Sequence, residues 1–340
     1  IFSIKHFMQM KTAICLFIVV LVLMGCGTRE TVLDRVVDIP DGVVLEIPDV
    51  PSLCDQMGFE GQYVEVNGTT LYVEREGDGP PVVLLHGGPG ATHHYFHPHF
   101  SRAADFCEVI YYDQRGCGLS GYDRGEKGYS VAQAADDLEA LRVALGHERW
   151  VVAGHSYGGL LAQVYAHRYP RSVSGLVLIC SAISINVYDE LERSRQNDYL
   201  TQEERLLINR IAEADSLNPA QRLFNRHLAG DWKRQSFFRP TEEDLARMVL
   251  YEWVHDPVFR SEVLRDFWRF QPDGTMEEFS IPVLVVEAEW DLTWSAEKPF
   301  LLRDQYPSCS FVMIPDAGHS PFADRPDEFM QALREFCDSL

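Results

Sequence analysis

The sequence predicts an α/β fold, in which a mostly parallel, doubly wound sheet carries an inserted helical cap. Short apolar runs such as residues 82–85 and 283–286 are typical of strands that are buried on both faces, as parallel strands are. Helical patterns separate these runs along the chain, and residues 182–279 interrupt the alternation. At 340 residues the chain is long enough for one such domain with an insertion.

The chain before and between these runs supplies the remaining elements. Residues 63–66 and 71–74 flank Asn67-Gly68, a pattern that predicts a β-hairpin. Ser130 and Gln133 form a capping box, which predicts the start of a helix. Further strands are expected at residues 109–112, 150–153, 176–179 and 311–314, and further helices at 160–169, near 296–305 and from Pro326.

Residues 182–279 contain no convincing strand but many charged and aromatic side chains. This composition predicts a helical insertion, so the core of the fold would consist of residues 59–181 and 280–340. Sheets of this class bind ligands beyond the carboxyl ends of their strands. The insertion is therefore expected to form a lid over that edge.

The first 25 residues predict an export signal instead of a part of the fold. Lys5 and Lys11 precede a largely apolar stretch at residues 13–24, which is shorter than the roughly 20 residues of a transmembrane helix. The stretch ends in Leu23-Met24-Gly25-Cys26, which resembles the lipobox of bacterial lipoproteins. A lipid on Cys26 would anchor an exported domain to a membrane, on its periplasmic or cell-surface side. The alternative is a plain secretory signal.

Residues 26–58 contain Pro40, Pro48 and Pro51 and predict a tether or an arm packed on the surface. The net charge of −21 argues against nucleic acid or an anionic membrane surface as the main partner. Outside the signal and Cys26, the cysteines are scattered without the spacing of a disulfide framework, so their redox state is open. They are Cys54, Cys107, Cys117, Cys180, Cys309 and Cys337.

The run Gly154-His155-Ser156-Tyr157-Gly158 lies between a predicted strand and a predicted helix. Glycines on both sides of a serine allow the sharp turn that exposes the hydroxyl at the end of a strand. Ser156 is therefore the candidate nucleophile. The backbone N–H of Tyr157 would lie at the start of the helix, where it can bind a developing oxyanion. The second donor is expected from Gly88, in the glycine-rich loop after residues 82–85.

A serine nucleophile needs a base, and the base needs an acid that orients it. Asp291 and His319 each come directly after one of the last two predicted strands, so both should lie at the same sheet edge as Ser156. Glu287 and Glu289 are alternatives to Asp291 as the acid. This chemistry requires no metal and no cofactor.

Three motifs together resemble the proline iminopeptidase group of α/β-hydrolases. They are residues 86–90 (HGGPG), 113–120 (DQRGCGLS) and 154–159 (GHSYGG). The resemblance implies an α/β-hydrolase fold and release of an N-terminal residue, often proline, from short peptides or amides. It also implies that Asp113 and Arg115 support the glycine-rich loop of residues 86–90, named the oxyanion loop.

In that family, carboxylates of the lid bind the free α-amine of the substrate. Glu252, in Tyr251-Glu252-Trp253, is the first candidate for this role, followed by Glu242 and Glu243. Two other hypotheses remain open: a carboxylesterase or lactonase that acts on another acyl substrate, and a non-catalytic binding lipoprotein. The histidines that follow the oxyanion loop receive no metal role, because no cysteine or carboxylate spacing supports one. They are His93, His94, His97 and His99.

Overall fold

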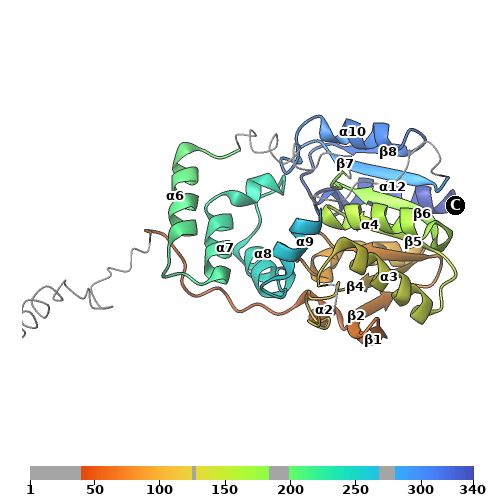
Figure 1. Ribbon diagram of the computed structural model, residues 1–340. Coiled ribbons are helices and arrows are strands. Elements are labelled where there is room, and N and C mark those ends of the chain that lie inside the picture. The colour runs from red at the N-terminus through yellow and green to blue at the C-terminus, as the bar shows by residue number, and fades with distance from the viewer. Residues whose placement is uncertain (1–39, 125–127, 184–198, 268–279) are drawn as a thin grey trace, which may run out of the picture.

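The computed structural model describes residues 40–124, 128–183, 199–267 and 280–340. Their strands form one eight-stranded sheet in the order β1-β2-β4-β3-β5-β6-β7-β8 (Figure 1). β1 and β2 pair antiparallel with each other, β2 pairs antiparallel with β4, and all other pairs are parallel. The predicted mostly parallel sheet is thus confirmed. The strands are β1 (Gln62–Val66), β2 (Thr69–Glu76), β3 (Pro81–Leu85), β4 (Glu108–Tyr112), β5 (Trp150–His155), β6 (Val173–Ile179), β7 (Val283–Ala288) and β8 (Ser310–Ile314).

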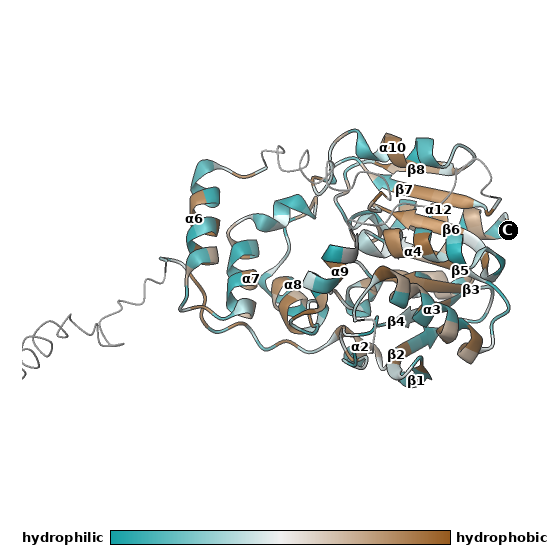
Figure 2. Ribbon diagram, viewed as in Figure 1, coloured by the Kyte–Doolittle hydropathy of each residue, from teal (hydrophilic) through white to brown (hydrophobic). Residues whose placement is uncertain are grey.

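The apolar runs are continuous because both faces of the sheet are covered. Val83 and Leu85 of β3 pack into one hydrophobic cluster, whereas Val82 and Leu84 pack into another on the opposite face. Figure 2 shows the hydrophobic colour of the central strands between more polar helices. The first face is covered by α3 (Val131–Leu145), α4 (Tyr157–Arg168) and α10 (Lys298–Gln305), and the second by η2 (His99–Asp105), α11 (Pro321–Asp324) and α12 (Pro326–Asp338).

Local sequence explains several boundaries. Asn67 and Gly68 both have positive φ, 43° and 74°, as the tight turn between β1 and β2 requires. Ser130 caps α3 by accepting a hydrogen bond from the Gln133 amide at 3.1 Å. α4 begins at Tyr157, earlier than the helix predicted over 160–169, because it starts directly after the turn at Ser156.

Every regular element described between β6 and β7 is helical. The first two of these helices lie well away from the sheet, while α9 lies beside the core (Figure 1). Capping boxes at Thr201, Asn218 and Thr241 start three of the helices. The elements are α6 (Gln202–Glu213), α7 (Pro219–Leu228), η4 (Asp231–Arg234), α8 (Glu242–Arg247), η5 (Met248–Glu252) and α9 (Phe259–Phe267). Residues 184–198 and 268–279 of the predicted lid lie outside the described residues.

Residues 40–58 run along the cap toward the sheet and end in the short helix α2 (Leu53–Met57) (Figure 1). The Asn225 side chain accepts from the Val44 amide at 2.7 Å and donates to the Val44 carbonyl at 2.8 Å. Val50 belongs to a hydrophobic cluster of the cap, and its carbonyl accepts a hydrogen bond from the Tyr251 hydroxyl at 2.8 Å. This segment, named the arm below, is therefore fastened to the cap.

No described helix has both the length and the apolar character that crossing a bilayer demands. The predicted signal at residues 1–25 and Cys26 lie outside the described residues. All six cysteines of the described ranges carry free thiols, and four of them are buried.

Candidate active site

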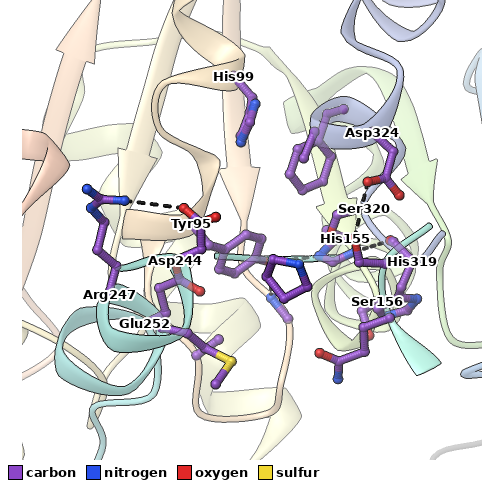
Figure 3. Close-up of a pocket in the computed structure, with 18 of the residues that line it drawn as sticks. Tyr95, His99, His155, Ser156, Asp244, Arg247, Glu252, His319, Ser320 and Asp324 are labelled. Carbon is purple, nitrogen blue, oxygen red and sulfur yellow. Dashed lines mark hydrogen bonds and ion pairs between the residues drawn. The ribbon is translucent and has the colours of Figure 1, made fainter. Parts of the chain in front are cut away.

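The carboxyl ends of the parallel strands bring the predicted site residues to one edge of the sheet. Gly88 follows β3, Ser156 follows β5, Asp291 follows β7 and His319 follows β8. Gly88, Ser156 and His319 line a cavity of about 570 Å³, whose opposite wall comes from the cap. Figure 3 shows Ser156 and His319 next to each other at one end of this pocket, with Glu252 and Asp244 toward the other.

Ser156 adopts a backbone conformation that few residues other than glycine tolerate, with φ 57° and ψ −120°. Such a conformation costs about 1–3 kcal/mol and persists only where the surroundings impose it. A Cβ on Gly154 would collide with the Gly158 carbonyl, and one on Gly158 would collide with the Leu85 carbonyl. The two glycines thus allow β5, α4 and β3 to approach closely enough to hold the turn.

His319 is oriented by Asp291, whose Oδ2 lies 2.8 Å from Nδ1 of the ring. Asp291 also accepts a hydrogen bond from the Thr293 amide at 3.0 Å. Burial alone would raise the pKa of Asp291, but the charge and hydrogen bond of His319 and the nearby Lys298 lower it below its ordinary value. An ionised carboxylate only accepts hydrogen bonds, so Nδ1 of His319 carries a proton. In the neutral ring Nε2 is then the nitrogen that can accept a proton from the Ser156 hydroxyl.

The two alternatives to Asp291 occupy different positions. Both oxygens of Glu287 lie 2.8 Å from the Lys298 ammonium, and both side chains are fully buried. Glu289 is exposed, and among the residues that the structure describes it accepts a hydrogen bond from the Asp316 amide alone, at 3.4 Å. Asp291 is therefore the carboxylate that contacts the histidine.

The glycine-rich loop brings Gly88 to the pocket beside Ser156. Gly88 has φ 115°, and a Cβ there would lie 2.5 Å from the Gly90 nitrogen, so only glycine fits. The Gly87 amide is already bound to the Tyr95 hydroxyl at 2.7 Å. The amides of Gly88 and Tyr157, the first residue of α4, are the two candidates for binding an oxyanion. The Tyr157 side chain points elsewhere and lines a separate small cavity.

A chain of hydrogen bonds links the oxyanion loop to residues 315–320, the segment that carries His319 and is named the histidine loop. The Gly87 amide donates to the Tyr95 oxygen, the Tyr95 hydroxyl donates to His155 Nδ1 at 2.9 Å, and His155 Nε2 donates to the His319 carbonyl at 2.7 Å. Burial, together with the charge of His319, lowers the pKa of His155 to about 3, so this ring stays neutral. Sequence reasoning assigned no role to Tyr95 or His155, although His155 lies in the run Gly154–Gly158 around Ser156.

Asp113 and Gln114 contact the oxyanion loop or the segment that follows it. The Gln114 amide donates to His86 Nε2 at 3.0 Å, and Asp113 accepts from the His93 amide at 2.8 Å. Arg115 forms two hydrogen bonds with the Asp137 carboxylate, at 2.7 and 2.9 Å, and both side chains are buried. Asp113 therefore holds the segment that follows the glycine-rich loop. The bonds of Arg115 go to Asp137 and to the Asp123 and Asn67 carbonyls, so its support of the loop stays a prediction.

Of the three predicted lid carboxylates, only Glu252 lines the pocket. Its Oε1 lies 3.9 Å from His94 Nδ1, and its side chain is 22% exposed. The positions of Glu242 and Glu243 do not support an amine-binding role: both are exposed at the start of α8, and Glu243 pairs with Arg247 at 3.2 Å. Asp244 lines the pocket instead, also bound to Arg247 at 3.2 Å.

The cap is hydrogen-bonded directly to the histidine loop. The His319 amide donates to the Gln235 carbonyl at 2.7 Å. Asp324 accepts from the Gly318 amide at 2.7 Å and from the Phe237 amide at 3.1 Å. Backbone atoms of the cap thereby help to fix the position of His319.

A strained serine, a histidine–aspartate pair and a glycine-rich loop at one edge of a parallel sheet define a hydrolase-type site. Residues 80–326 match the family model described as alpha/beta hydrolase fold, and the chain belongs to this family. Proline iminopeptidases are among its relatives. That of Saccharolobus solfataricus is 24% identical over 294 residues, covering 84% of this chain and 94% of the relative. That of Lactobacillus helveticus is 28% identical over 303 residues, covering 83% and 95%.

The fold also resembles a solved structure, the proline iminopeptidase of Mycobacterium smegmatis. The TM-score is 0.62 at 22% identity, and the match covers 82% of this chain and 98% of the other. The predicted α/β-hydrolase fold and the resemblance to the proline iminopeptidase group are thus confirmed, and the chain is an enzyme of the α/β-hydrolase class.

The Lys298–Glu287 pair generates a prediction about stability. Glu287→Gln removes the charge that directly pairs with the fully buried Lys298 ammonium. We therefore expect the free energy of unfolding to fall by about 3–5 kcal/mol. Glu289→Gln, at an exposed carboxylate, serves as the matched control and should change it by less than about 0.5 kcal/mol. Urea titration followed by circular dichroism measures both. Equal stability of the two variants would contradict the assigned role of Glu287.

Proposed function

We propose that this protein is a serine hydrolase that works through an acyl-enzyme, and that it releases N-terminal residues, proline among them, from short peptides or amides. The observation that carries the proposal is the strained Ser156 beside the His319–Asp291 pair, in a pocket that also holds Glu252. The Ser156 hydroxyl attacks the scissile carbonyl while His319 takes its proton. The resulting oxyanion binds the Gly88 and Tyr157 amides. His319 then protonates the leaving amine, and water hydrolyses the acyl-enzyme.

Glu252 is the group proposed to bind the substrate amine. It lies in the cap wall of the same pocket as Ser156, it has no arginine or lysine partner among the described residues, and it is accessible from the pocket. A free α-amine carries a positive charge at neutral pH, and a partly buried carboxylate binds such a charge strongly. The proline iminopeptidases among the relatives support this substrate class.

The second candidate is hydrolysis of an ester or another acyl substrate without a free amine. Asp244 is bound to Arg247, and Arg239 also lines the pocket, so the cap wall is not uniformly negative. A substrate with an anionic or neutral acyl group would fit such a wall. The same nucleophile and oxyanion donors would serve it.

The amine-bearing and the blocked substrate separate these functions. We expect turnover of proline 4-nitroanilide, with Ser156→Ala lowering kcat by about 10⁵-fold or more because the nucleophile is lost. Release of 4-nitroaniline at 405 nm reports the rate. Acetyl-proline 4-nitroanilide should react far more slowly, since its nitrogen carries no charge. Turnover of 4-nitrophenyl butyrate alone would favour the acyl hydrolase, and failure of a fluorophosphonate to label Ser156 would exclude both.

Glu252→Gln keeps the size of the side chain but removes its charge. Loss of a charged hydrogen bond of about 1.5–3 kcal/mol predicts a fall in kcat/KM of about 10- to 100-fold on proline 4-nitroanilide, most of it in KM. Activity on 4-nitrophenyl butyrate should hardly change. Glu242→Gln, at an exposed carboxylate of the same cap, is the control and should behave like the parent protein. Equal losses in both variants would refute the amine-binding role of Glu252.

We further propose that the chain is an exported lipoprotein held at a membrane by a lipid on Cys26. The support is the apolar stretch that ends in Leu23-Met24-Gly25-Cys26. In a bacterial host, Cys26→Ala should move the protein from the membrane fraction to the soluble fraction and remove the mass of the lipid. Density flotation and intact-mass analysis measure these changes. A Cys26→Ala protein that still floats with membranes would contradict the anchor.

A further inference from the structure

A second group of polar side chains lies outside the proposed catalytic machinery, behind the oxyanion loop. Cys54 comes from α2 of the arm, Glu74 from β2, and His93 and His97 from the segment η1 (His93–Phe96) and its C-cap. All four are buried, and one potential ligand atom of each lies within 4.8 Å of the others. The histidines received no metal role from the sequence because no cysteine or carboxylate was close along the chain. The fold supplies both from distant segments.

Three separations within this cluster are close to those of ligands around a small ion. His93 Nε2 lies 3.7 Å from Cys54 Sγ and 3.4 Å from Glu74 Oε1, and His97 Nε2 lies 3.0 Å from Glu74 Oε2. Tetrahedral zinc, with bonds of about 2.0–2.3 Å, places neighbouring ligand atoms about 3.3–3.6 Å apart. These three separations differ from those values by a few tenths of an ångström, and the remaining ones are at most 4.8 Å.

The outer contacts orient the same atoms inward. His93 Nδ1 lies 2.8 Å from Asp113 Oδ1, which directs Nε2 of the same ring at Cys54 and Glu74. Metal-binding histidines usually donate their other N–H to a carboxylate in this way. The Tyr72 hydroxyl donates to Glu74 Oε1 at 2.8 Å and fixes that carboxylate. Two of the four candidate ligands are thus held by groups outside the cluster.

Charge gives an independent argument. Glu74 and Asp113 are 1% and 0% exposed, and their ion-pair partners among the described residues are histidines, with no lysine or arginine. Buried carboxylates need compensation by a positive charge. A divalent cation supplies it while both imidazoles stay neutral. A thiolate and imidazole nitrogens favour zinc over magnesium or calcium, which prefer oxygen ligands.

We propose that Cys54, Glu74, His93 and His97 bind one Zn²⁺ ion in a closed, four-ligand structural site. The ion would join the arm to β2 and to the segment that follows Gly88. The contact between the Leu53 amide and His94 Nε2, at 3.0 Å, links the same two segments. This site has no part in the proposed acyl transfer, so the two proposals stand or fall separately.

The full-length protein, expressed without a histidine tag and purified under reducing conditions, tests the site. Inductively coupled plasma mass spectrometry should find about one zinc per chain. Replacement by Co²⁺ should give tetrahedral d–d bands and a near-ultraviolet thiolate-to-cobalt band. Cys54→Ser should abolish the thiolate band, and His97→Ala should weaken Zn²⁺ binding about 100-fold in competition with a chelating dye. Cys107→Ser is the matched control, because that buried thiol donates only to the Ala103 carbonyl, and it should bind normally.

A chelator supplies a test that no variant's folding can obscure. Removal of zinc from the parent protein should lower Tm by several degrees, and adding Zn²⁺ back should restore it. Parent protein that takes up neither Zn²⁺ nor Co²⁺ would overturn the proposal in favour of a proton-sharing histidine network. A second cluster, Cys180, Asp291 and His319, could also hold an ion. Binding that survives in both Cys54→Ser and His97→Ala but is lost in Asp291→Asn would place the metal there and equally overturn the proposal.

Discussion

The rest of the site depends on the close backbone contacts around the sharp turn at Ser156, called the elbow here. Gly158 lies so close to the end of β3 that no side chain fits between them, and Gly154 lies equally close to Gly158 itself. This packing holds Ser156 in its strained conformation and sets the start of α4, so one arrangement positions both the hydroxyl and the Tyr157 amide. It also places the elbow against the strand that leads into the loop carrying Gly88. The proposed nucleophile and the proposed oxyanion donors are therefore positioned by the same close approach.

The sheet could be predicted from the sequence because its signal is local. The apolar runs of β3, β5, β6 and β7, the turn at Asn67-Gly68 and the glycines around Ser156 are all legible within a few residues. Because parallel strands end at the same edge of the sheet, the motifs that follow β3, β5, β7 and β8 could be expected to lie together there. The choice of Asp291 over Glu287 was open in the sequence. It needed the position of Lys298, which lies on a helix after β7 and removes Glu287 from consideration.

Features that depend on packing between distant segments could not be predicted. Nothing near Tyr95 indicates that its hydroxyl joins Gly87 to His155, and nothing near Cys54 indicates that it meets His93. In the cap, the direction in which neighbouring acids point decided between them: Asp244 and Glu252 line the pocket while Glu242 and Glu243 do not, a distinction that depends on how short helices pack. The arm was expected as a tether or a surface-packed segment, but its bonds to Asn225 and Tyr251 required the folded cap.

The bonds from Gln235 and Phe237 to the histidine loop and to Asp324 bear on how this family can diverge. A cap that touched only the substrate could be exchanged between relatives, with the rate of the chemical step left intact. Here backbone atoms of the cap bind the His319 amide and the Asp324 side chain, so a replaced cap alters the position of the histidine as well. Under the proposed function, substrate range and turnover are then coupled traits in this chain. A chimera that borrows a relative's cap would need the matching histidine loop to be transplanted with it.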